Sequence, residues 1–262
     1  MFADSASEDL NKALDTMREK HFLPAYMNRR QRNLMFKEKY KSQLENSPAK
    51  VTLGDEDFPL VHVNKHKDVP ARGPLVNSII KMMRENGEWD HLPSLLDGLH
   101  AAKASPSIET QEKMIRQAAM DEQFDVILSC LKKVDDTGMT LKNDDILHWV
   151  LRGLRLSPAK HDWNRKYLAK ALKQSWELAM IFEQKGHTRG KTPRDLTSDD
   201  PRKNPSVIGY WLELYAMNAV RYQKSEDRDG NVKKYADRAL SCLQQSEVSA
   251  HEHGLQSLTD DD

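Results

Sequence analysis

The chain of 262 residues is long enough to bury a sizeable core, and its 40 Lys and Arg residues are balanced by 40 Asp and Glu residues. The zero net charge argues against a protein that binds nucleic acid through a uniformly basic surface, although it allows a local basic patch. No apolar run reaches the roughly 20 residues that a membrane-spanning helix needs. The two cysteines, Cys130 and Cys242, are far apart, which favours buried thiols in a reducing compartment.

The start of the chain, MFADSASEDL, is acidic and resembles neither a secretory signal nor an Arg-rich transit segment. We therefore expect either a cytosolic protein or a mature chain from which a presequence has been removed.

Residues 1–45 predict an N-terminal helical arm. A first helix is expected from Ser7 to His21, with Ser7 as its cap, and a second from Pro24 to Leu44. The second helix carries a basic cluster interleaved with aromatic residues: Arg29, Arg30, Arg32, Lys37, Lys39 and Lys41. Such a cluster can pair with RNA phosphates or with an acidic protein surface. The alternative is a solvated charged helix that packs through its Tyr, Met and Phe side chains.

Residues 46–73 predict an extended strap. Proline and glycine interrupt this segment repeatedly, and its polar–apolar alternation is too weak to predict a sheet. We expect the apolar residues 58–61 to anchor the strap on a surface of the protein.

Residues 74–185 predict a helical repeat domain, because the chain partly matches itself when it is shifted by 35 residues. Ile80 falls on Ile115 and then on Val150, while Leu96 falls on Leu131. A fixed period in this range is typical of stacked helix pairs. The expected helices span residues 74–85, 89–104, 108–120, 121–136, 143–156 and 163–184. We expect Ser157-Pro158 to end the fifth helix and Trp176 to lie in the core.

Three segments complete the chain. Residues 186–206 predict a polar surface loop, and residues 207–246 a terminal helical hairpin. Residues 247–262 predict an acidic, disordered tail. In and beside the loop, basic residues form a second candidate contact with RNA: Lys185, His187, Arg189, Lys191, Arg194, Arg202 and Lys203. Asp195, Asp199 and Asp200 dilute this charge.

The sequence contains none of the common catalytic motifs. There is no phosphate-binding loop, no nucleophile elbow and no set of His and Cys residues at metal-ligand spacing. The acidic clusters at residues 55–57 and 199–200 fall in predicted loops without a positioned partner. We therefore predict a protein that is not an enzyme, with no cofactor and no metal site.

Several positions of the 35-residue period carry a family pattern. Gly87 stands at the turn between two helices, Leu96 and Leu131 at an apolar position of the second helix, and Pro106 and Gly138-Met139 at the end of a repeat. Over residues 73–157 the chain thereby resembles degenerate pentatricopeptide repeats, while residues 205–246 resemble a tetratricopeptide-type hairpin. The resemblance implies an all-α solenoid of helix hairpins.

In that family, two side chains of a repeat can read one RNA base. The resemblance makes Asn77 and Ser107 a possible base-reading pair, whereas Glu112 and Leu147 depart from the pattern. Such degenerate repeats resemble those of mitochondrial ribosome components, including fungal ones, which act as protein scaffolds that touch RNA without reading its sequence.

The resemblance therefore predicts a structural or assembly component of a mitochondrial ribonucleoprotein, above all the mitoribosome. Its expected partners are neighbouring subunits and the backbone of rRNA or mRNA, in the mitochondrial matrix. One alternative is a free mitochondrial RNA-binding factor for mRNA stability or translation. Another is a cytosolic, tetratricopeptide-type adaptor that grips peptides.

Overall fold

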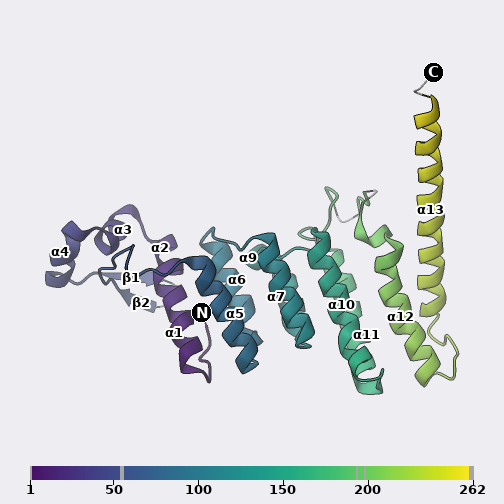
Figure 1. The fold of residues 1–262 in the computed structure, drawn as a ribbon, viewed down its shortest axis with the longest axis horizontal. Coiled ribbons are helices and arrows are strands. Elements are labelled where there is room, and N and C mark those ends of the chain that lie inside the picture. The colour runs from purple at the N-terminus through teal and green to yellow at the C-terminus, as the bar shows by residue number, and fades with distance from the viewer. Residues whose placement is uncertain (1, 54–55, 193, 198, 260–262) are drawn as a thin grey trace. The chain divides into compact units, whose positions relative to one another are not determined.

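The structure, a computed structural model, describes residues 2–53, 56–192, 194–197 and 199–259, without the side chains of Leu53, Glu56 and residues 246–259. The described chain is mostly helical, which confirms the all-α class (Figure 1). It forms two compact units. Unit 1 comprises Met1–Thr110 and Asp135–Met139, and unit 2 comprises Gln111–Val134 and Thr140–Asp262.

The first predicted helix of the arm is present. α1 (Glu8–Met17) begins where the Ser7 side chain accepts a hydrogen bond from the backbone N–H of Leu10. It continues as the π-helical segment η1 (Arg18–Phe22) and the short helix α2 (Leu23–Tyr26). The buried face of α1 consists of Leu10, Leu14 and Met17, and α1 packs against α5 (Arg72–Asn86).

The prediction of one helix from Pro24 to Leu44 is wrong. The chain instead forms α3 (Arg29–Phe36), η2 (Glu38–Tyr40) and α4 (Lys41–Asn46). The first break follows from local chemistry, because Met27 is extended and Asn28 starts α3 with a reciprocal capping box to Gln31. Lys37 is also extended, which ends α3.

The strap contains a sheet, contrary to the prediction. β1 (Lys50–Leu53) pairs antiparallel with β2 (Glu56–Pro59), so that Val51 lies opposite Phe58. Two of the three residues of the predicted acidic loop, Glu56 and Asp57, therefore belong to a strand, and Asp55 lies outside the described residues.

Arm and strap share one hydrophobic cluster. Leu60 anchors the strap in this cluster, whereas its neighbour Val61 is 62% exposed. The buried members come from both segments: Leu23, Met27, Met35, Leu44, Val51, Leu60 and Val63. Burial of one face, rather than strong alternation, thus accounts for this short hairpin.

The first helix pair of the predicted repeat region lies in unit 1. α5 ends at Gly87, which adopts the left-handed conformation with φ 71°, and η3 (Trp89–His91) leads into α6 (Leu92–Ala101). Pro93 lies in the first turn of α6, where a missing N–H costs little. Ile80 and Leu96 are each 1% exposed, as the alignment predicts.

The next elements in the chain are α7 (Ile108–Met120), α8 (Phe124–Lys132), α9 (Val134–Thr137), α10 (Asp144–Lys160) and α11 (Arg165–Phe182). The aligned residues Ile115, Leu131 and Val150 are fully buried. The prediction that α10 ends at Ser157-Pro158 is wrong. Pro158 lies in the last turn of α10, and the helix continues past it to Lys160.

The prediction that Trp176 lies in the core is also wrong, since this side chain is 62% exposed. The buried face of α11 instead includes Gln174 and Ser175. The indole N–H of Trp211 donates to the backbone carbonyl of Ser175 at 3.1 Å, which helps to explain why this face is the buried one.

The terminal hairpin follows η4 (Pro201–Lys203) and consists of α12 (Pro205–Tyr222) and α13 (Asn231–Thr259). Tyr215 of α12 stacks on Tyr235 of α13 with ring centroids 5.4 Å apart. α13 continues to Thr259, so residues 247–259, where we expect a disordered tail, are helical in the structure. Helix propagation from the packed first turns favours this continuation. The acidic end, residues 260–262, lies outside the described residues.

Candidate nucleic-acid interface

The arm presents arginine side chains in the first turn of α3. Arg29, Arg30 and Arg32 are exposed, and no carboxylate of the described chain forms an ion pair with any of them. The free N–H groups at the start of a helix add positive potential at the same place. The opposite side of α3 contributes Met35 to the hydrophobic cluster. α3 is therefore cationic where it faces solvent and apolar where it packs.

The lysines of the arm extend this cationic surface. Lys37, Lys39 and Lys41 are exposed, and the ammonium nitrogen of Lys39 lies 4.8 Å from the ring centroid of Tyr40. Our two interpretations of the arm are thus compatible in geometry. Met27 and Met35 belong to the hydrophobic cluster and Phe36 packs against it, while the cations remain in solvent.

Arg189 of the polar loop is engaged within the protein. Its guanidinium donates to the backbone carbonyl of Asp199 at 2.8 Å and also pairs with the carboxylate of Asp144. Only 16% of its side chain is exposed. Arg189 therefore holds the loop against the start of α10 instead of facing solvent.

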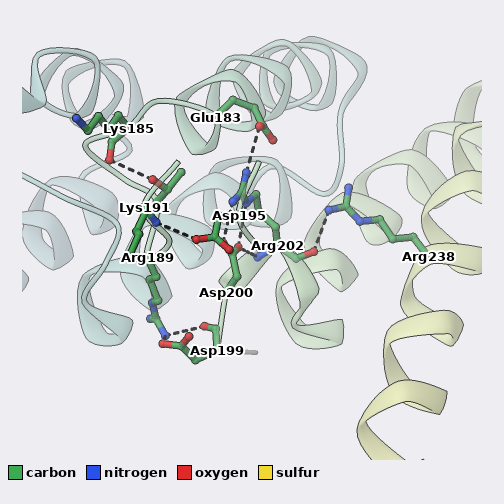
Figure 2. Close-up of polar contacts among 10 residues, drawn as sticks. Glu183, Lys185, Arg189, Lys191, Asp195, Asp199, Asp200, Arg202 and Arg238 are labelled. Atoms are coloured by element: carbon green, nitrogen blue, oxygen red, sulfur yellow. Dashed lines mark hydrogen bonds and ion pairs between the residues drawn. The ribbon is translucent and has the colours of Figure 1, made fainter. Parts of the chain in front are cut away.

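A second ion-pair network fixes the end of the loop. Arg202 pairs with Asp200 at 2.8 Å and with Glu183 at 3.1 Å, while Arg238 donates to the backbone carbonyl of Arg202 at 2.9 Å (Figure 2). Burial raises the pKa of Asp200, but the hydrogen bonds from Arg202 outweigh this effect and hold the pKa below its ordinary value. Carboxylates in and beside the loop thus neutralise Arg189 and Arg202 by direct contact.

Three basic residues in and beside the loop face solvent. Lys185, Lys191 and Arg194 are exposed, and within the described part of the loop their side chains form no ion pair. The backbone N–H of Lys191 donates to the carboxylate of Asp195 at 3.2 Å. The second predicted contact with RNA is therefore reduced to these three cations.

His187 belongs to the interior rather than to the basic surface. It is 1% exposed, its Nδ1 accepts from the backbone N–H of Leu141 at 3.2 Å, and its Nε2 donates to the carbonyl of Leu131 at 2.9 Å. These bonds require the neutral ring, which has one donor and one acceptor. No feature of the sequence distinguishes this histidine from its basic neighbours.

The structure brings the possible base-reading pair together. Asn77 of α5 and Ser107, which precedes α7, line one pocket of about 200 Å³ together with Arg72 and Thr110. The hydroxyl of Ser107 lies 3.1 Å from that of Thr110. The pocket offers amide, hydroxyl and guanidinium groups to a small polar ligand.

One further arrangement of basic and aromatic side chains is not evident from the sequence. Trp149, which the repeat alignment places at an apolar position, is only partly buried and lies beside the guanidinium groups of Arg116 and Arg152. The helical period cannot show that two arginines flank an indole, because one of them comes from another helix.

Two kinds of site are not found among the residues that the structure describes. No group of three or more His, Cys, Asp or Glu side chains is placed to hold a metal ion, and no described helix is both long and apolar enough to cross a membrane.

Comparison with known proteins identifies the family. The family model of the mitochondrial ribosomal protein mS27 matches residues 1–262. The small ribosomal subunit protein mS27 of Neurospora crassa is 25% identical over an alignment of 252 residues, which covers 91% of this chain and 64% of the relative. The chain thus spans somewhat less than two thirds of the length of this relative. The prediction of a mitochondrial ribosome component is confirmed at the level of the family, whereas the pentatricopeptide resemblance stays a prediction. Because the family model covers residues 1–262, the chain belongs to the mitochondrial ribosomal protein mS27 family.

Proposed function

We propose that this chain is a structural component of the small subunit of the mitochondrial ribosome, where it holds neighbouring proteins and the rRNA backbone. Membership of the mS27 family carries this proposal. A ribosomal-protein family also supports a structural role rather than a catalytic one. The ribosome to which it belongs would lie in the mitochondrial matrix.

The arm is the part of the chain best suited to contact rRNA. It combines exposed arginines in the first turn of α3 with three exposed lysines, and it holds them on a compact apolar cluster. Guanidinium groups bind phosphates through paired N–H donors, and lysines add positive charge. Lys185, Lys191 and Arg194 form a smaller second contact.

The helix pairs supply a scaffold for neighbouring proteins. Residues that the 35-residue alignment equates, such as Ile80, Ile115 and Val150, are buried at corresponding places of α5, α7 and α10. This agreement supports a protein built from pentatricopeptide-like or tetratricopeptide-like hairpins. Such hairpins present broad surfaces without a catalytic pocket.

A free mitochondrial RNA-binding factor is the second candidate function. One observation favours it, namely that Asn77 and Ser107 line one pocket. A protein of this kind would bind a single-stranded RNA by itself and would read a base at this pocket.

Sedimentation of a tagged copy of the chain in a lysate of mitochondria tests the first proposal against the second. We expect the protein to migrate with the small ribosomal subunit after magnesium chelation, and to stay with it in high salt. Migration as a small free species would instead favour the RNA-binding factor. The variant R29Q/R30Q/R32Q should weaken the association, whereas the exposed control R165Q on α11 should leave it unchanged.

A further inference from the structure

We propose that Trp149, Arg116 and Arg152 form a site for the phosphodiester backbone of RNA, which we call the Trp149 site. This inference rests on the proposed function, because it names a place where unit 2 would contact rRNA. Trp149 and Arg152 belong to α10, and Arg116 belongs to α7. The site is separate from the arm, the polar loop and the pocket at Asn77.

Two guanidinium groups lie over one indole ring. The guanidinium carbon of Arg152 is 5.0 Å from the ring centroid of Trp149, and that of Arg116 is 5.7 Å from it. Both distances fall within the range of cation–π attraction, about 6 Å. The adjacent residue Val150 is fully buried, so the backbone that carries Trp149 is fixed by the core. The indole thereby limits the positions available to both arginine side chains.

The two arginines keep donors for a ligand. A guanidinium that contacts an aromatic ring through its face still has N–H groups around its edge. Arg152 is exposed and forms no ion pair with a carboxylate of the described chain. Arg116 is 42% exposed, and its partner Glu112 lies 3.6 Å away, which is longer than a hydrogen bond. Neither charge is therefore fully neutralised within the protein.

The chemistry of the site favours RNA over an acidic protein. Because both guanidinium carbons lie within about 6 Å of one ring centroid, the site concentrates positive charge and favours a ligand that carries several negative charges. The phosphates of RNA meet this condition, and their geometry matches the paired donors of arginine. A base of the RNA can also stack on an arginine guanidinium, and such stacking tolerates any sequence. An acidic peptide would use the charges but has no base to stack.

Binding of the purified chain to a fluorescent oligouridylate of about 16 nucleotides, measured at several salt concentrations, tests the inference. R116Q and R152Q should each weaken binding about tenfold, and each should lower the slope of affinity against salt by about 1. W149L should weaken binding without changing this slope, because it removes the positioning of the arginines but not their charge. R152K should do the same, because lysine keeps the charge and loses the planar group.

Two controls distinguish the Trp149 site from general effects. R165Q removes an exposed arginine of α11, and W176L removes a tryptophan that is 62% exposed on the same helix. Both should bind the oligouridylate like the unchanged protein. Circular dichroism should show native helix content for all variants, and R152Q and R152K, which alter an exposed side chain, remain informative if W149L does not fold.

Three results would overturn the inference. The first is that the variants of the site bind RNA with unchanged affinity and salt dependence. The second is an equal loss of binding in R165Q or W176L. The third is that an oligoglutamate of equal charge binds as tightly as the RNA and is weakened by the same substitutions, which would indicate an acidic protein partner. Since sedimentation with the ribosome tests the proposed function separately, a failure of the Trp149 site can be distinguished from a failure of that function.

Discussion

Glu122 ties the turn between α7 and α8 to the end of α10. Its carboxylate accepts hydrogen bonds from Ser157 at 2.7 Å, His161 at 3.1 Å and Lys160 at 3.4 Å. Burial raises the pKa of Glu122, but the bonds from Ser157 and His161 outweigh this effect, so the pKa lies below its ordinary value of 4.5. The charged form is therefore more stable in the folded protein than in the unfolded chain.

We predict that E122Q lowers the free energy of unfolding by about 1–2 kcal/mol at neutral pH, because charge-assisted hydrogen bonds are lost. A folded pKa below the unfolded one stabilises the protein above pH 4.5, and this stabilisation disappears as the pH falls through the folded pKa. Urea denaturation at neutral and acidic pH should show a difference that shrinks with acidification. The control E19Q, at an exposed carboxylate, should show none.

Gly153 allows α7 and α10 to approach closely. A Cβ atom at this position would lie 2.8 Å from the Cβ of Ala119, which is too near for an ordinary contact. We predict that G153A destabilises the protein by about 1–3 kcal/mol through overpacking. Gly209 of α12 is the matched control, because a Cβ there meets nothing within 4 Å. G209A should raise stability by about 0.5–1 kcal/mol, since alanine favours helix. Destabilisation of equal size by both substitutions would argue against the close approach.

At the scale of elements, the repeat alignment makes a direct prediction about the core. Ile115 and Val150 are equivalent in the alignment and are both fully buried. Replacement of either by Asp would bury an unpaired charge at a cost of several kcal/mol, so we expect I115D and V150D to unfold the helix pairs around them. Circular dichroism should show a large loss of helix. Native helix content in both variants would mean that the alignment is out of register.

The helices were largely predictable, because apolar residues recur at the helical period through most of the chain. The face that a helix buries was less predictable where polar side chains take part. On α11 the period places Trp176 with Leu168 and Leu172, yet the buried face includes Gln174, whose amide donates to Asp125 at 2.6 Å. A partner on another helix selects this face, and no local pattern contains that information.

The candidate sites were predictable only in part for a similar reason. Charge clustering in the sequence located the exposed cations of the arm correctly. The same criterion included Arg189 and His187, which the fold uses internally through partners that include Asp144 and Leu131, 45 and 56 positions away in the sequence. It omitted Trp149, because the cation–π contact with Arg116 joins two helices. Long-range pairing therefore decides which basic residues remain available for a ligand.

At the scale of the whole molecule, zero net charge is compatible with RNA binding because the charges are distributed unevenly. Arg189 and Arg202 of the polar loop are paired with Asp144, Asp199, Asp200 and Glu183. The cations of the arm between Arg29 and Lys41 have no such partners in the described chain. Acidic residues elsewhere balance the total. The field that a polyanion meets therefore depends on local clusters rather than on the sum.

This distribution predicts that two sets of arginine substitutions have opposite consequences. R29Q/R30Q/R32Q removes three exposed charges, so RNA affinity and its salt dependence should fall while the melting temperature stays nearly constant. R189Q removes a mostly buried group that joins the loop to Asp144, so stability should fall by about 1–3 kcal/mol, with RNA affinity preserved in the folded fraction. Thermal denaturation and RNA titration of both variants check the prediction. R189Q could instead lower RNA affinity at unchanged stability. In that case the ion pairs of Arg189 would be too weak to keep its charge from binding a ligand, and the loop would be a second cationic surface beside that of the arm.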